Sequence, residues 1–234
     1  NQIFFIVNQL ALSIGNALVA ICSQYWGKQE TGAIRKMTGV ALALSVLIGA
    51  IVVTACTCIP EQLLRIFTTS PEIIAEGKAY LGLLKWTFLL FMISNLLIAM
   101  LRSVEVVKIS FVISVVSLIT NGCINYTLIF GHFGFPEMGI KGAAVGTLTA
   151  RMLELLIIVV YVWKIDTKVR LFDVNLIRII FAPVNRKIWM AFLKVAFPIM
   201  CSGMIWAISV PMQTAILGHL SADAIAANSV SSTF

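Results

Sequence analysis

The chain has 234 residues, of which 60% are hydrophobic and 12% are charged, and its mean hydropathy is +1.00. Soluble domains carry roughly 25% charged residues, so this composition excludes an ordinary soluble domain and indicates a membrane protein. The net charge of +7 does not indicate nucleic-acid binding, because the basic residues are scattered between apolar stretches and form no basic face.

Several stretches stay apolar over the roughly 20 residues that a helix needs to cross a bilayer. The predicted spans are residues 2–26, 37–59, 80–101, 109–131, 140–163 and 196–218. The predicted fold class is therefore an all-α polytopic membrane protein with six transmembrane helices. The first residue is not Met, and an apolar pattern restarts just before residue 234, so we expect a fragment of a longer protein.

Basic residues predict the orientation of these spans, because cytoplasmic loops carry an excess of Lys and Arg. If the loop at residues 27–36 is cytoplasmic, 12 of the 17 Lys and Arg residues fall on the cytoplasmic side. The exceptions are Arg65, Lys78, Lys85 and Lys141 on the outer side, and Arg151 within a span.

The five cysteines all fall within predicted spans, at positions 22, 56, 58, 123 and 201. Their placement supports neither a disulfide framework nor a metal cluster. We expect them to be small buried apolar side chains.

The first three spans carry few polar residues. Gln9, Ser13, Asn16, Ala20 and Ser23 follow one face of the first span, which suits close helix packing or a water-filled lumen. Pro60 is expected to end the second span, and residues 61–77 to form an outer loop, with the next helix starting at Ser70-Pro71. The third span places Ser94 and Asn95 at mid-depth.

The fourth span carries a polar stripe that continues for four helical turns. Its members are Ser110, Ser114, Ser117, Asn121 and Asn125. A single Ser or Asn most often bonds to a neighbouring helix, but five in register favour a wall that faces a cavity. We expect Asn121 and Asn125 to bind a cation or the substrate through their carboxamide oxygens, with Na⁺ as a candidate ion and no other metal expected.

The fifth span combines close packing with charge. Gly142 and Gly146 form a Gly-x-x-x-Gly motif that permits close approach of a neighbouring helix. Arg151 and Glu154 are the only charges at mid-depth, and their i,i+3 spacing predicts that they pair. Two alternatives remain open: a static ion pair, or a carboxylate that loses its partner in one conformation and takes up the coupling ion.

Residues 166–187 form a charged stretch that predicts a linker with an interfacial helix between two lobes. The predicted organisation is an N-terminal lobe at residues 1–165, the linker at 166–187 and the start of a C-terminal lobe at 188–234. In the sixth span, Ser202, Trp206, Ser209 and Gln213 share a face beside Pro211. This pattern fits a kink that lines the cavity, although a purely structural kink fits as well.

Four stretches together resemble the multidrug and toxic compound extrusion (MATE) transporters. They are Ser-Gln-Tyr-Trp-Gly-Lys at 23–28, Asn-x-x-x-Asn-Tyr-x-Leu-Ile-Phe-Gly at 121–131, Phe-Gly-Phe-Pro-Glu-Met-Gly-Ile-x-Gly-Ala-Ala at 133–144, and Leu-Gly-His-Leu-Ser-Ala-Asp-Ala-Ile-Ala-Ala-Asn at 217–228. Their order and spacing cover nearly the whole chain.

The resemblance implies twelve helices in two six-helix lobes around a central cavity. On that template the chain covers helices two to seven and the start of helix eight. It departs from the family at known coupling positions: Asn125 stands where one branch has an Asp, and Gly203 where another branch has a Glu. The first branch also has an Asp on helix one, which lies outside this chain, and the corresponding position in the second lobe is Gln213. The resemblance therefore does not show which ion is coupled.

The function that follows is a secondary antiporter, coupled to Na⁺ or H⁺, that exports drugs and other organic, often cationic, compounds across the plasma membrane, which is the inner membrane in bacteria. Its partners are small-molecule xenobiotics, membrane lipids and the rest of the polypeptide, without nucleic acid or a cofactor. The alternative is a lipid-linked oligosaccharide flippase, which needs a more basic cavity. An enzyme is not expected, because no nucleophile lies beside a base. The pathway candidates are Asn121, Asn125, Arg151, Glu154, Gln213, Ser209, Asn95 and Asn16.

Overall fold

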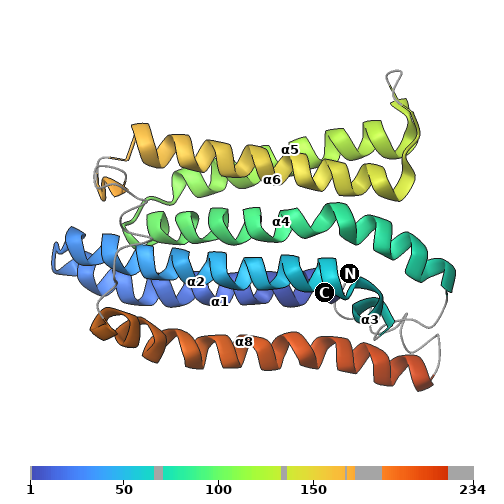
Figure 1. The fold of residues 1–234 in the computed structure, drawn as a ribbon. Coiled ribbons are helices and arrows are strands. Elements are labelled where there is room, and N and C mark those ends of the chain that lie inside the picture. The colour runs from blue at the N-terminus through green and yellow to red at the C-terminus, as the bar shows by residue number, and fades with distance from the viewer. Residues whose placement is uncertain (1, 66–70, 133–135, 167, 172–185, 221–234) are drawn as a thin grey trace.

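The structure, a computed structural model, describes residues 2–65, 71–132, 136–166, 168–171 and 186–220 (Figure 1). Within these ranges the chain is helical, which confirms the predicted all-α fold class. The helices are α1 (Gln2–Gly27), α2 (Thr31–Cys58), α3 (Pro60–Arg65), α4 (Pro71–Ser103), α5 (Lys108–Phe130), α6 (Gly139–Lys164) and α8 (Arg186–Leu220).

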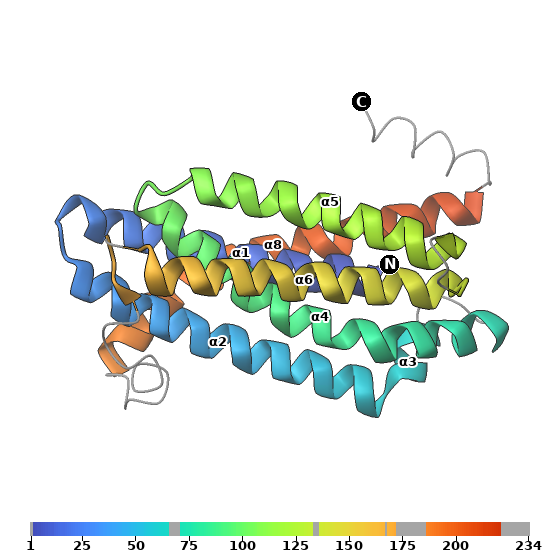
Figure 2. The same cartoon turned by 90° about the horizontal axis from the view of Figure 1, so that it is seen from above.

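The long helices lie side by side in layers (Figures 1 and 2). α5 and α6 form an outer pair, α4 lies between that pair and the pair formed by α1 and α2, and α8 packs on the far side against α1 and α2. Successive long helices run in opposite directions, as expected for a chain that crosses a membrane back and forth. α5 packs almost entirely against α6 and barely touches α4.

Six helices are long and apolar enough to span a bilayer, and they match the six predicted spans in order. One bound is wrong: the sixth helix begins at Arg186, not near residue 196. Arg186, Lys187 and Lys194 lowered the hydropathy of that stretch, yet they lie in the first turns of α8. Arg186 and Lys187, the last two residues of the predicted linker, thus form the first turn of α8. The predicted interfacial helix falls largely on residues 172–185, outside the described residues.

The prediction of a plain outer loop after Pro60 is also wrong. Pro60 begins the short helix α3, and an exposed ion pair joins Arg65 to Glu61 one turn earlier at 2.7 Å. Proline is favoured at the first position of a helix, because the amide hydrogen that it lacks would have no partner there. The next predicted start is confirmed, since α4 begins at Pro71.

Close contact between α5 and α6 depends on the predicted glycine motif. A Cβ at Gly142 would lie 2.8 Å from the backbone carbonyl of Leu128, and one at Gly146 would overlap the Oδ1 atom of Asn125. At Gly142 a side chain would meet fixed backbone, and at Gly146 it would displace the Asn125 side chain, so the close helix approach predicted from the Gly-x-x-x-Gly motif is confirmed. The chain reverses between the two helices after Gly131, which adopts a left-handed conformation (φ +69°) at the end of α5.

The segment after α6 folds back under the ends of the helices. The carboxylate of Asp166 accepts hydrogen bonds from the backbone N–H groups of residues 168, 169 and 170, at 3.1, 3.2 and 3.0 Å. The side chain of Val169 is fully buried, and its carbonyl accepts a hydrogen bond from Arg35 Nε at 2.7 Å. Lys168 Nζ donates to the carbonyl of Val104 at 2.8 Å. These contacts tie the start of the predicted linker to α2 and to the end of α4.

The five cysteines are free thiols, but their predicted burial holds for only two of them. Cys22 and Cys56 are buried between helices, whereas Cys58, Cys123 and Cys201 are exposed on the surface of the helical bundle. The apolar sequence context of a cysteine therefore does not distinguish a side chain that faces other helices from one that faces outward, since both surroundings are apolar in a membrane protein.

Candidate functional site

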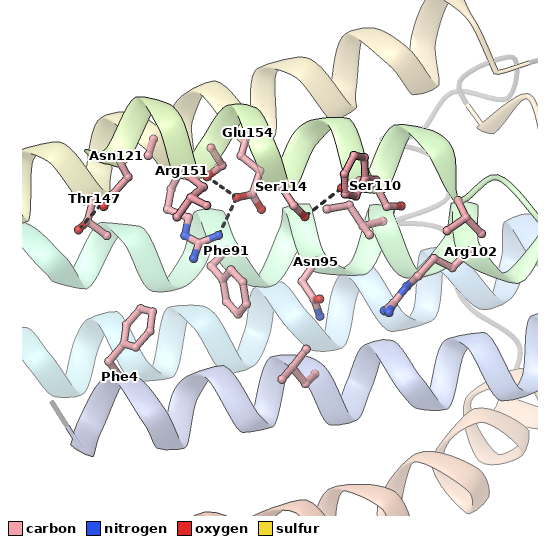
Figure 3. Close-up of a pocket in the computed structure, with 17 residues that line it drawn as sticks. Phe4, Phe91, Asn95, Arg102, Ser110, Ser114, Asn121, Thr147, Arg151 and Glu154 are labelled. Atoms are coloured by element: carbon pink, nitrogen blue, oxygen red, sulfur yellow. Dashed lines mark hydrogen bonds and ion pairs between the residues drawn. The ribbon is translucent and has the colours of Figure 1, made fainter. Parts of the chain in front are cut away.

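A cavity of about 760 Å³ lies between α1, α4, α5 and α6 (Figure 3). This volume falls in the range of pockets that bind drug-sized molecules. Its lining residues are Phe4, Leu12, Phe91, Asn95, Ile98, Arg102, Val107, Ser110, Phe111, Ser114, Ser117, Leu118, Asn121, Thr147, Ala150, Arg151 and Glu154.

One wall of the cavity is formed by the polar stripe of α5. Four of its five members, Ser110, Ser114, Ser117 and Asn121, line the cavity, while Asn125 lies one turn beyond it. The opposite side of α5 is apolar and exposed, as at Val112, Val115 and Ile119, and only Ile113 of this helix is fully buried. α5 is thus amphipathic within an apolar span, with its polar side turned toward α4 and α6.

Glu154 is the most enclosed charge in the cavity, with 6% of its side chain exposed. Its Oε2 atom accepts a hydrogen bond from Arg151 Nη1 at 2.6 Å, which is the ion pair that the i,i+3 spacing predicted. Its Oε1 atom accepts one from Ser94 on α4 at 2.7 Å, and Oε2 a further one from Ser117 on α5 at 3.2 Å. The carboxylate therefore connects three helices, α4, α5 and α6.

Arg151 is less enclosed than its partner, with 24% of its side chain exposed. Its guanidinium group lies over the ring of Phe91 on α4, 4.5 Å from the ring centre. Figure 3 shows Arg151 and Phe91 together in the middle of the cavity. Cation–π contact adds a second stabilising interaction for this arginine beside the ion pair.

Asn121, Asn125 and Thr147 form a polar cluster at one end of the cavity. Asn125 Nδ2 donates to Asn121 Oδ1 at 2.9 Å, and Asn121 Nδ2 donates to Thr147 Oγ1 at a long 3.5 Å. The Oδ1 atom of Asn125 is buried, has no hydrogen-bond partner in the part of the chain that the structure describes, and lies against Gly146. The two asparagines thus lie together as predicted, and the cluster holds three neutral oxygen atoms that could bind a cation. Thr147 was not singled out from the sequence, although it lies beside the glycine motif on the same helix.

Arg102 and Ser110 lie at the other end of the cavity (Figure 3). Arg102 lies one residue beyond the predicted third span at residues 80–101, but it belongs to the last turn of α4 and lines the cavity. Its Nε atom and the Oγ atom of Ser110 are both buried and have no hydrogen-bond partner among the described residues. A signal was present in the sequence: residues 91, 95, 98 and 102 recur at helical spacing, and all four line the cavity.

The remaining candidates lie elsewhere or serve packing. Asn95 lines the cavity, but its Nδ2 atom donates to the carbonyl of Ala11 at 2.8 Å and so links α4 to α1. Asn16 is exposed and Ser209 donates to the carbonyl of Ile205 at 2.8 Å, and neither residue lines this cavity. Gln213 lies in α8, but its side chain falls outside the described part of the chain.

Comparison with known proteins identifies the family. The MatE family model matches residues 1–127, which is more than half of the 234-residue chain. The chain belongs to the MatE family.

Two curated relatives of this MatE chain carry the name "probable multidrug resistance protein NorM". The protein from Rhizobium meliloti (strain 1021) is 29% identical over 161 residues, which cover 69% of this chain and 34% of the relative. The protein from Thermotoga maritima is 28% identical over 165 residues, which cover 70% of this chain and 35% of the relative. The chain thus matches about a third of the length of these relatives.

Solved structures share the fold of this MatE chain. A MOP superfamily transporter from Pyrococcus furiosus has a TM-score of 0.79 at 19% identity, over 95% of this chain and 48% of its own. A multidrug resistance MATE family transporter matches in its outward-facing conformation, with a TM-score of 0.79 at 19% identity over 92% and 46% of the two chains. An inward-facing conformation of a transporter with that description has a TM-score of 0.78 at 20% identity, over 92% and 47%.

MatE membership and the six spans make this chain a multi-pass membrane protein of the plasma membrane or bacterial inner membrane. The family consists of transporters and not of enzymes, and its members need no cofactor.

Proposed function

We propose that this MatE chain forms the first lobe, and the beginning of the second, of a secondary antiporter that exports drugs and other organic compounds in exchange for Na⁺ or H⁺. The observation that carries the proposal is the 760 Å³ cavity with polar groups from three helices. The multidrug resistance names of the curated relatives support export of xenobiotics over the flippase alternative. The lobe boundary at residues 166–187 is part of this proposal.

Alternating access is the mechanism that fits the fold comparison. The same helices match an outward-facing and an inward-facing transporter nearly equally well, with TM-scores of 0.79 and 0.78. This similarity supports a lobe that changes little internally while it moves against a second lobe. In such a cycle, the cavity opens to each side of the membrane in turn.

The asparagine cluster is the proposed binding site for a coupling Na⁺ ion. Asn121 Oδ1, Asn125 Oδ1 and Thr147 Oγ1 are neutral oxygen atoms, and hard cations prefer oxygen ligands. Because carboxamides do not titrate, this cluster cannot exchange protons directly. Proton coupling would therefore require a group that titrates. Glu154, the acidic residue that lines the cavity, is the candidate for this role.

The test is gradient-driven export in vesicles reconstituted with the complete transporter. Fluorescent organic compounds should move when a Na⁺ or H⁺ gradient is imposed, and should not move without one. Asn121→Ala and Asn125→Ala should lower export while the protein still inserts, whereas Asn16→Ala, an exposed asparagine outside the cavity, should transport normally. No gradient-driven movement of any compound would contradict the antiporter. Normal export by the double variant of Asn121 and Asn125 would limit both residues to helix packing.

A further inference from the structure

The charges that line the cavity do not balance. Two lining residues are cationic, Arg102 and Arg151, and one is anionic, Glu154, so the lining carries a net charge of +1. Arg151 and Glu154 neutralise each other through their 2.6 Å ion pair. Arg102 forms no ion pair among the residues that the structure describes. The uncompensated charge of the cavity is therefore the guanidinium group of Arg102.

The end of the cavity at Arg102 and Ser110 also holds polar groups without hydrogen-bond partners among the described residues. Arg102 Nε and Ser110 Oγ are buried, and neither has a hydrogen-bond partner within the described ranges. Buried polar groups are nearly always paired, because an unpaired one loses its hydrogen bonds to water without replacement. Both atoms can donate: Arg102 through its Nε–H and Ser110 through its hydroxyl. Figure 3 shows the Arg102 side chain extending along the cavity toward Asn95, with Ser110 at the same end of the cavity.

We infer that this end of the cavity binds the carboxylate group of an amphipathic organic anion or zwitterion. A carboxylate has two oxygen atoms, which can accept from the guanidinium and the hydroxyl together, and it neutralises the unpaired charge. The apolar part of the ligand lies farther along the cavity, against Leu12, Ile98 and Phe4. An organic cation is repelled by the positive charge of Arg102, and the low dielectric constant within the span strengthens this repulsion.

The inference rests on the proposed function in one respect, that this cavity is the binding site of the transporter. It narrows the substrate class from organic compounds in general to those that carry a carboxylate. Because binding can be measured without any gradient, it can be tested separately from transport.

Three probes with the same naphthalene ring system separate charge from shape: 2-naphthylacetate, the neutral 2-naphthylacetamide, and (2-naphthylmethyl)trimethylammonium. Equilibrium dialysis with the complete, purified transporter should show that the acetate binds about tenfold more tightly than the amide, the difference that a hydrogen bond to a charged group confers. The ammonium compound should bind no more tightly than the amide. Tighter binding of the ammonium compound, or equal binding of acetate and amide, would overturn the inference.

Arg102→Gln should remove the advantage of the acetate and leave binding of the amide unchanged. Lys108→Gln is the matched control, since it removes an exposed positive charge six residues later, outside the cavity. An equal loss in both variants would mean that surface charge attracts the acetate, and would overturn the site. If Arg102→Gln does not fold, Ser110→Ala tests the same end of the cavity, and should weaken the acetate severalfold and leave the amide unaffected.

Pyrophosphate distinguishes a carboxylate site from a site for the headgroup of a lipid-linked sugar. Inorganic pyrophosphate should compete with 2-naphthylacetate no better than acetate ion does. Displacement at much lower concentrations of pyrophosphate would overturn the carboxylate as the ligand. Binding as expected together with absent gradient-driven export would instead leave this site in place and contradict the antiporter.

Discussion

Removing either member of the Arg151–Glu154 pair should destabilise the protein, but by different amounts. In Arg151→Gln, the Glu154 carboxylate, with 6% of its side chain exposed, keeps only its hydrogen bonds from Ser94 and Ser117. Breaking a buried ion pair in this way costs about 3–5 kcal/mol. In Glu154→Gln, the remaining arginine has 24% of its side chain exposed and keeps its contact with the Phe91 ring, so we expect a smaller loss of about 2 kcal/mol.

The double variant Arg151→Gln/Glu154→Gln provides the control, because it leaves no charge unpaired. It should be more stable than Arg151→Gln alone, and the two substitutions should be strongly non-additive. The measurement is the free energy of unfolding of the complete transporter in mixed micelles, followed by tryptophan fluorescence as SDS is added. Equal losses in the two single variants, or a double variant that is simply additive, would refute the reasoning from exposure.

Transport by the same variants separates the two roles that remain open for Glu154. In this structure the carboxylate is paired, which supports a static role in holding α4, α5 and α6 together. A static pair predicts that folded Glu154→Gln protein still couples drug export to ion flux. Folded protein that exports without ion flux would show that Glu154 is a coupling site. Poor folding of Glu154→Gln that the double variant rescues would support the static pair.

Three further predictions concern orientation, helix contact and the folded-back segment. In a background without the native cysteines, Glu30→Cys should be protected from an impermeant thiol reagent added outside, while Glu61→Cys should react; the reverse would invert the predicted topology. Gly146→Leu should destabilise the α5–α6 contact by about 1–3 kcal/mol, whereas Gly122→Leu, with open space around its Cβ position, should have little effect on the same unfolding measurement. Asp166→Ala removes the acceptor for three backbone N–H groups and should speed protease cleavage near residue 168; unchanged cleavage would count against this anchoring.

The spans and their order could be predicted from the sequence because hydropathy acts over about 20 residues and averages out local exceptions. The predicted helix ends are wrong where one residue is compatible with two local structures. Pro60 both ends α2 and begins α3, because a residue without an amide hydrogen fits a helix start. Arg186 and Lys187 resemble linker residues, although long basic side chains at the end of a span can reach the polar interface.

The candidate site could be predicted only as far as one helix determines it. The stripe from Ser110 to Asn121, and the pairing of Arg151 with Glu154, follow from helical spacing alone. Ser94 lies 60 residues from Glu154 along the chain, so its hydrogen bond depends on how α4 packs against α6. Arg102 was missed for a related reason: whether a charge at the end of a span points into a cavity or into solvent depends on the neighbouring helices.

The polar contacts of α5 and α6 have a consequence for how this part of the chain enters the membrane. Asn125 pairs with Asn121, Asn121 with Thr147, and Ser117 and Arg151 with Glu154, so these polar groups find partners within the two helices. If these pairs form before the hairpin leaves the insertion machinery, fewer unpaired polar groups face the lipid than if either helix entered alone. The hydrogen bond from Ser94 and the contact of Arg151 with Phe91 then join this hairpin to α4. Insertion of these two helices is therefore expected to be concerted, and a truncation that ends the chain after α5 should leave that helix poorly inserted.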